Sequence, residues 1–134
     1  MRAFEGHQNS VTSVHFTSDS SIIMSSAQDR MIKLWNASTG ACLRTLEGHT
    51  DSVEDVAFTE DANRALSAGL DGTLRLWDVR DRRCEEVLQG HRGGVLAVAM
   101  DPSGMAAISG GQDGTVRVWD VRGKRGTHVL EGHT

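Results

Sequence analysis

The stretch GHTDSVEDVAF, from Gly48 to Phe58, decides the fold because close copies of it recur at one fixed spacing. GHRGGVLAVAM begins 42 residues later, at Gly90, and GHQNSVTSVHF begins 42 residues earlier, at Gly6. A fourth GH pair stands at 132–133. A period of this length indicates a solenoid, a propeller or an array, and the local structure within each unit must decide between them.

The spacing divides the chain of 134 residues into three units, 7–48, 49–90 and 91–132, without insertion or deletion. Residues 1–6 match the end of a unit, and we interpret them as part of the outer strand of a preceding repeat. We therefore expect a single domain over 1–134 that consists of three equivalent segments.

Each unit contains four short stretches with β-strand character. In the third, apolar residues alternate with Lys33, Arg75 or Arg117, as expected of a strand with one buried face. Segments rich in Asp, Ser and Gly separate the stretches and are typical of turns. The stretches are 10–16, 21–27, 31–36 and 42–48; 52–58, 64–70, 73–78 and 84–90; and 94–100, 105–111, 115–120 and 126–132. Four antiparallel strands in about 42 residues predict one propeller blade per unit, and hence an all-β fold.

The tryptophan motifs make this prediction specific. WN, WD and WD stand at Trp35, Trp77 and Trp119, each unit opens on the histidine of a GH pair, and an aspartate precedes each third strand. These features resemble the WD-repeat β-propeller family over the whole chain. The resemblance implies blades of four antiparallel strands and a role in protein recognition.

Four residue types recur together at the 42-residue step, and two interpretations compete for them. Serine, histidine and aspartate are the components of a hydrolase triad, but no copy is singled out as an exposed nucleophile. The alternative, which the resemblance also implies, is a buried relay in which indole, hydroxyl, imidazole and carboxylate satisfy one another. The three structural tetrads are His7, Ser25, Asp29 and Trp35; His49, Ser67, Asp71 and Trp77; and His91, Ser109, Asp113 and Trp119.

Two positions in the first unit depart from the pattern. Asn36 stands where the other units have Asp78 and Asp120, outside the tetrads. Arg30 replaces the glycine found at 72 and 114, so we expect a different type of turn between the second and third strands of this unit.

Charge and cysteine content narrow the class of protein. A net charge of -4 and a pI of about 5.8 disfavour binding to nucleic acid or to an anionic membrane. The chain has no membrane-length apolar run and begins without the character of a secretory signal, so we expect a cytoplasmic protein. Cys42 and Cys84 lie one period apart, which favours two lone thiols over a disulfide, and no zinc site or cofactor is expected.

Three blades would leave two apolar blade faces uncovered, whereas propellers close with about four to eight blades. Self-association of the chain would cover both faces, because one end of a repeat array complements the other. A ring of whole chains has six blades as a dimer or nine as a trimer; we favour the homotrimer, with the homodimer next. The division of the chain into exact 42-residue repeats is also compatible with an engineered ring or with a fragment of a longer propeller.

The resemblance implies protein contacts three and five residues after each histidine and one residue before each tetrad aspartate. The candidate binding face is thus Ser10, Thr12 and Gln28; Ser52, Glu54 and Leu70; and Gly94, Leu96 and Gln112. We predict a non-catalytic scaffold for protein-protein interaction built from several identical chains. The alternatives are a self-assembling propeller fragment or engineered ring without a specific ligand and a Ser-His-Asp hydrolase.

Overall fold

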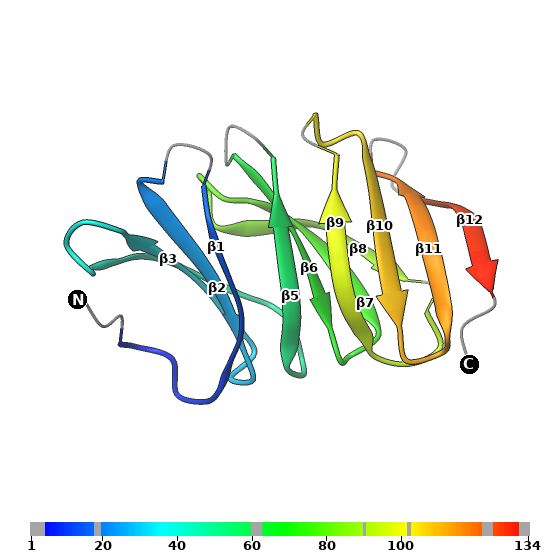
Figure 1. The fold of residues 1–134 in the computed structure, drawn as a ribbon, viewed down its shortest axis with the longest axis horizontal. Coiled ribbons are helices and arrows are strands. Elements are labelled where there is room, and N and C mark those ends of the chain that lie inside the picture. Colours follow the sequence, from blue (N-terminus) through cyan, green and yellow to red (C-terminus); the bar gives the residue numbers. More distant parts are fainter. Residues whose placement is uncertain are drawn as a thin grey trace.

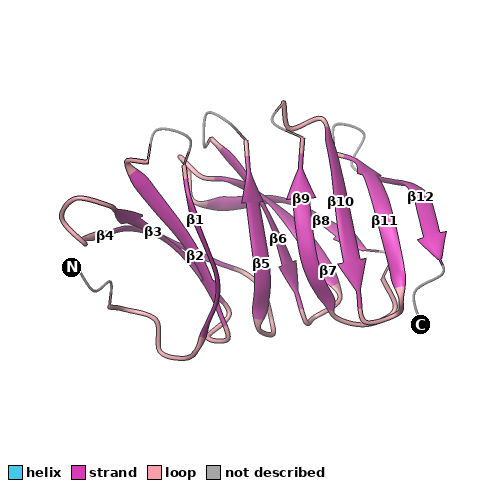
Figure 2. Cartoon of the chain, viewed as in Figure 1, coloured by secondary structure: helices cyan, strands magenta, loops and turns pink. Residues whose placement is uncertain are grey.

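The computed structural model describes residues 5–17, 20–59, 63–89, 91–101 and 103–121, together with the backbone of 125–131. Within these ranges the chain forms twelve strands and no helix (Figure 2). Arg2 and Phe4, which belong to the predicted partial strand at 1–6, lie outside the described residues.

The strands form three four-stranded antiparallel sheets, each from one stretch of chain, which we call blades 1 to 3. Blade 1 contains β1 (Val11–Phe16), β2 (Ile22–Ala27), β3 (Met31–Asn36) and β4 (Cys42–Glu47). Blade 2 contains β5 (Val53–Phe58), β6 (Arg64–Gly69), β7 (Thr73–Asp78) and β8 (Arg83–Gln89). Blade 3 contains β9 (Val95–Met100), β10 (Ala106–Gly111), β11 (Thr115–Asp120) and β12 (Arg125–Glu131). The predicted all-β fold of four antiparallel strands per unit is confirmed.

The blades stand side by side in chain order, with blades 1 and 3 at opposite ends (Figure 1). β5 lies next to both β1 and β9, so the first strands of the three blades are neighbours along one side of the stack. This arrangement brings the equivalent loops of successive units to the same end of the molecule.

Two apolar cores hold the blades together. In the first core, Met24 and Ile32 of blade 1 pack with Val53, Val56 and Trp77 of blade 2, and all five are buried. The second core repeats this contact one unit later, between blades 2 and 3. Blade 2 therefore presents one face to blade 1 and the opposite face to blade 3.

The expectation of a different turn at Arg30 is wrong. Arg30 adopts φ 73°, close to 84° at Gly72 and 79° at Gly114. Its backbone N–H donates to the carbonyl of Ala27 at 3.3 Å, and the two glycines make the equivalent bonds at 3.1 and 3.2 Å. The repeated flanking strands impose the left-handed turn, and the arginine accepts a conformation that favours glycine.

Both cysteines are free thiols, Cys42 exposed and Cys84 packed beside the first core. Among the described residues, no group of three or more His, Cys, Asp or Glu side chains is arranged to hold a metal ion. The same part of the chain contains no helix that could span a membrane.

Candidate functional site: the tetrads and the candidate binding face

The four predicted residues of blade 2 form one hydrogen-bonded chain. Trp77, on β7, donates its indole Nε1–H to the Ser67 hydroxyl on β6 at 2.8 Å. The same hydroxyl lies 2.5 Å from Nε2 of His49, which precedes β5. Nδ1 of His49 lies 2.9 Å from a carboxylate oxygen of Asp71, in the turn between β6 and β7. A neutral imidazole that accepts at Nε2 and donates at Nδ1 satisfies every partner.

Blades 1 and 3 contain the same chain of contacts. The indole-to-hydroxyl distance is 2.8 Å in both, and the histidine Nε2 lies 2.7 Å from the serine Oγ in both. The histidine Nδ1 lies 2.8 Å from the carboxylate in blade 1 and 3.1 Å from its nearer oxygen in blade 3. The structure thus brings together His7, Ser25, Asp29 and Trp35, and likewise His91, Ser109, Asp113 and Trp119.

Each tetrad aspartate also binds two stretches of backbone. Asp71 accepts the backbone N–H of Thr50 and of Thr73, both at 3.0 Å, and the Thr73 hydroxyl at 2.7 Å. The first blade has Met31 at the threonine position, so Asp29 receives only the backbone bond there, at 3.0 Å. The aspartate therefore fixes the loop that carries the histidine as well as the histidine ring. Sequence reasoning missed this second task, although an aspartate two residues before a strand is a common signal of such a turn.

The hydrogen bonds determine the charge state of each tetrad. Burial alone would raise the pKa of Asp71, but hydrogen bonds from Thr73 and His49 lower it to about 2. Burial is the main cause that lowers the pKa of His49, and the hydrogen bond to Asp71 opposes it. The pKa values of Asp29 and Asp113 are also lowered, against the effect of burial, by bonds from the backbone and from their histidines. At neutral pH each carboxylate is ionised.

Glycines make room for the large rings of the tetrads. A Cβ atom on Gly48 would lie 3.0 Å from the edge of the Trp77 ring, so the glycine of the GH pair packs against the tryptophan of the unit that follows it. A Cβ atom on Gly69 would lie 2.5 Å from Nδ1 of His49. Blade 1 has Ala27 at the equivalent position, and its histidine and tryptophan rings meet at 61° rather than the 51° found in blade 2.

The serines are poorly placed to act as nucleophiles. Ser25, Ser67 and Ser109 are only 4%, 0% and 2% exposed, and each hydroxyl is already held between an indole and an imidazole. A catalytic serine must reach both its substrate and an oxyanion-stabilising group. The geometry supports mutual hydrogen bonding between the blade's strands and loops more strongly than acyl transfer.

The candidate binding face consists of loops that are joined in pairs. The backbone N–H of Gln28 donates to the carbonyl of Ser10 at 2.9 Å, and the same bond joins Leu70 to Ser52 and Gln112 to Gly94 at 2.9 Å. Six of the nine predicted positions are therefore held by one repeated contact. Ser10, Gln28, Leu96 and Gln112 are exposed; Thr12, Glu54 and Leu70 are half-buried; and Ser52 and Gly94 are buried.

A hollow of about 270 Å³ opens between blades 2 and 3 beside this face. Leu70 and Asp71 line it from blade 2, and His91 and Gly93 line it from the loop before β9. Leu70 also reaches across the junction, since a Cβ atom on Gly94 would lie 2.6 Å from its Cδ2. The hollow combines one apolar side chain with several polar groups.

Comparisons with known sequences match each of the three repeats to one family of proteins. The family model for "WD domain, G-beta repeat" matches residues 1–36, 40–78 and 82–120. WD repeat-containing protein 18 of Mus musculus is 36% identical over 44 residues, which are 33% of this chain and 10% of that protein. Nuclear distribution protein PAC1 of Candida tropicalis is 41% identical over 46 residues, 34% of this chain and 9% of that protein. The matched segment is thus about a tenth of these relatives' length.

Solved structures resemble almost the whole chain. The chains entitled "Structure of U3-55K" and "Crystal structure of RRP9 WD40 repeats" each give a TM-score of 0.92, with 27% and 28% sequence identity. Both comparisons cover 99% of this chain and 42% of the other. WD40 repeat proteins generally act as protein-interaction scaffolds and not as catalysts. With three matched repeats and a tetrad in every blade, this chain belongs to the WD40 repeat family.

Proposed function

We propose that this chain is a non-catalytic β-propeller scaffold for protein-protein interaction, assembled from several identical chains in the cytoplasm. The observation that supports it is the repeated bond between the two loops that each blade contributes to the candidate binding face, which holds these loops in the same conformation in all three blades. A rigid surface loses little conformational entropy when a partner binds. Recognition on such a platform needs no bond-breaking chemistry, which agrees with the buried serines.

Leu70 is the residue on which we expect a partner to depend most. It lies beside the hollow between blades 2 and 3, where an apolar side chain of a partner would be surrounded by polar groups that orient it. Gln112 is exposed on the neighbouring loop, and its side-chain oxygen accepts the backbone N–H of Gly94 at 2.9 Å. We therefore expect a protein segment with an apolar residue flanked by hydrogen-bonding groups.

Affinity capture with matched variants tests the scaffold. A stoichiometric protein should be retained by the unmodified chain and by Val87→Glu, which alters an exposed residue on β8 outside the candidate binding face. Leu70→Glu and Gln112→Arg should both lose it while remaining folded at the temperature of the experiment. Retention by both of these variants would contradict the proposal.

The composition of the candidate binding face favours one alternative, a self-assembling ring with no specific ligand. Its nine positions contain no Trp, Tyr or Arg, the side chains that most often anchor protein interfaces. Under this alternative the capture experiment returns no stoichiometric partner, although the chains still associate with one another. The same experiment therefore separates the two functions.

A serine-directed fluorophosphonate probe tests the remote hydrolase alternative. We expect no labelling, because all three hydroxyls are buried and hydrogen-bonded. Ser25 is the most favourable case for labelling, since it lines a hollow on the uncovered side of blade 1. Labelling that disappears in Ser25→Ala would establish a nucleophile and contradict the non-catalytic assignment.

A further inference from the structure

The side of blade 1 that faces away from blade 2 is apolar and uncovered. Val11, Val14 and Phe16 on β1 are 50%, 57% and 60% exposed. Their equivalents one unit later include Val53 and Val56, which are 0% and 1% exposed because blade 1 covers them. We call Val11, Val14, Phe16 and Ile23 the open face of blade 1.

Blade 3 carries the complementary uncovered surface. Ile108 on β10 is 48% exposed, whereas its equivalents Met24 and Leu66 are completely buried at the two internal junctions. Ala99 is exposed, while its equivalent Ala57 packs against the second core. We call Ala97, Ala99, Ile108 and Val116 the open face of blade 3.

The internal junctions show how two such faces fit. At the first junction Met24 and Ile32, which are equivalent to Ile108 and Val116, pack against blade 2. Their partners there are Val53 and Val56, which are equivalent to Val11 and Val14. The second junction repeats the arrangement with different apolar side chains. The two open faces thus keep the residue types that form a core at both internal junctions, and burial of these apolar side chains would be favourable.

The shape of the open face of blade 3 suits a large side chain such as the one that blade 1 exposes. Blade 3 has a hollow of about 220 Å³ lined by Ala97, Ala99 and Ile108 among others, and none of its lining residues is charged. Only this blade has alanine at both positions, because blade 1 has Ser13 and His15 there and blade 2 has Asp55 and Ala57. A protruding aromatic ring such as Phe16 is the kind of group that this hollow would hold.

A hydrogen bond from one blade to the next forms at each internal junction, but blade 3 has apolar residues at the corresponding positions. Thr12 of blade 1 donates its hydroxyl to the carbonyl of Val53 at 2.5 Å. Asp55 of blade 2 accepts the backbone N–H of Val98 in blade 3 at 3.1 Å. The equivalents of Thr12 and Asp55 on blade 3 are Leu96 and Ala97, so this surface offers apolar contact to its neighbour instead.

We propose that the open face of blade 3 receives the open face of blade 1 from a second copy of this chain, with Phe16 of that copy seated over Ala97, Ala99 and Ile108. The contact is head-to-tail, as between blades 1 and 2 within one chain, so each copy leaves one face to bind and one to be bound. This inference rests on the proposed assembly from identical chains and names the surfaces that make it.

Mixed crosslinking tests the orientation of the contact. In a background with Cys42→Ser and Cys84→Ala, one chain carries Val11→Cys and another carries Leu96→Cys. By the repeat, this pair is equivalent to Val53 and Thr12, which are in contact across the first internal junction. A short bis-maleimide should join the unlike chains only when they are mixed. Efficient crosslinking of either chain with itself, or none in the mixture, would overturn the head-to-tail contact.

Charged substitutions on the open faces provide the second measurement. Phe16→Asp and Ile108→Asp should each convert the assembly to single chains, without lowering the unfolding temperature of that single chain, because both residues are exposed within it. Val87→Asp, on an exposed part of β8, is the matched control and should leave the mass unchanged. A mass unaffected by either face variant would overturn the proposal.

Failure of the contact between copies can be distinguished from failure of the scaffold function. Leu70 and Gln112 lie on blades 2 and 3 of the same chain, so capture of a partner there does not require a second copy. If the unmodified chain is monomeric, the open faces belong against other blades and the second-copy contact is wrong. Partner capture that depends on Leu70 would still support the scaffold.

Discussion

At the scale of the residue, His49 is the centre of the best-buried tetrad. His49→Ala leaves the Ser67 hydroxyl and the Asp71 carboxylate without their common partner, and we expect the free energy of unfolding to fall by about 1 to 3 kcal/mol. Denaturant unfolding measures the loss. His15→Ala is the control, because the His15 side chain is 45% exposed, and its cost should be smaller. Equal stability of His49→Ala and the unmodified chain would argue against a structural role for the tetrads.

Acid should destabilise the folded chain through the same residues. The pKa of Asp71 falls from its ordinary 3.8 to about 2 in the fold, so the unfolded chain binds a proton first as pH drops. The stabilisation from Asp71 is complete above about pH 5 and disappears between about pH 4 and pH 2. His49 acts in the same direction at higher pH, since burial lowers its pKa from the ordinary 6.5 and its contribution is lost below that value.

Unfolding free energies measured from pH 7 to pH 3 check the acid effect. We expect Asp71→Asn to be less stable than the unmodified chain at pH 7, by on the order of 1 to 2 kcal/mol. The difference should narrow below about pH 4, because the asparagine variant has no carboxylate to protonate there. Parallel curves over the whole range would show that Asp71 does not contribute through its ionised form.

Arg30 is a position where the sequence can be improved. The arginine adopts φ 73°, a left-handed conformation in which a side chain costs about 1 kcal/mol relative to glycine. Arg30→Gly should therefore raise the free energy of unfolding by about 0.5 to 1 kcal/mol, and Gly72→Ala should lower it by a similar amount. Thermal unfolding of the two variants should show shifts of opposite sign. Destabilisation by Arg30→Gly would mean that the arginine side chain makes a compensating contribution.

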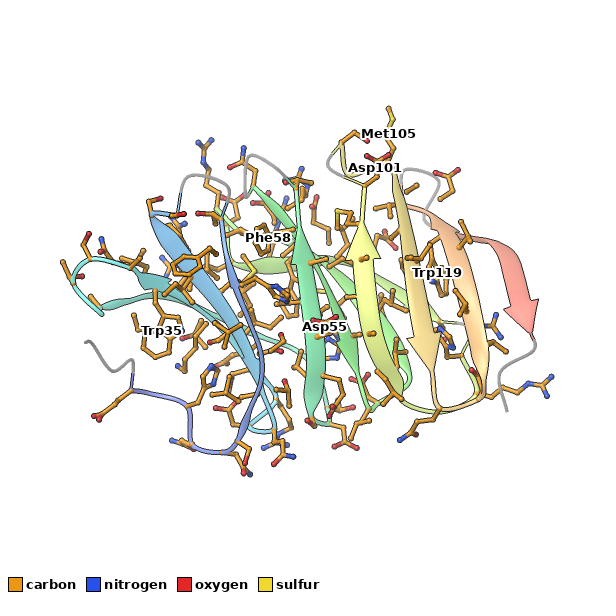
Figure 3. The ribbon with its side chains drawn as sticks, in the orientation of Figure 1. Trp35, Asp55, Phe58, Asp101, Met105 and Trp119 are labelled. Carbon is orange, nitrogen blue, oxygen red and sulfur yellow. The ribbon has the colours of Figure 1, made fainter. Side chains whose placement is uncertain are left out.

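At the scale of the element, Asp55 links three neighbouring strands. One carboxylate oxygen accepts the N–H of Val56 on β5 at 2.9 Å and lies 3.3 Å from His15 on β1. The other accepts the N–H of Val98 on β9 at 3.1 Å. Figure 3 labels Asp55 on β5. We expect Asp55→Ala to cost about 1 to 3 kcal/mol and the exposed control Asp81→Ala less than about 0.5 kcal/mol. Similar costs for the two variants would show that the bridge contributes little.

Repetition explains which elements the sequence could predict. Strands and tetrads recur at one spacing, so three copies agree on the positions of residues such as Ser67 and Trp77. Asp55 was not predictable in this way, because blade 1 has Ser13 and blade 3 has Ala97 at its position. The turn at Arg30 was predicted incorrectly from local preference, since the strands on either side determined its conformation. The sequence pattern therefore identifies what the blades share, and the structure adds what joins unlike blades.

At the scale of the whole molecule, the two internal cores and the two open faces are formed by apolar side chains at equivalent positions of the repeat. Trp77 is buried at an internal junction, and its equivalent Trp35, which is itself only 2% exposed, lines a hollow of about 320 Å³ on the open face of blade 1. The large apolar residues exposed around that hollow require a covering surface if the chain is to stay in solution without aggregating. In the assembly that we propose, further copies supply this surface and extend the candidate binding face around a ring.

Light scattering after size-exclusion chromatography measures whether the chain assembles into a closed ring of its own copies. We predict a single species with three times the 14.5 kDa mass of one chain, a closed ring of nine blades, or with twice that mass, a ring of six. The mass should stay constant on dilution through the range in which the peak is detectable, because a closed ring has no free face. A monomer, or a continuous distribution of masses, would contradict assembly of the chain into a closed ring of its own copies.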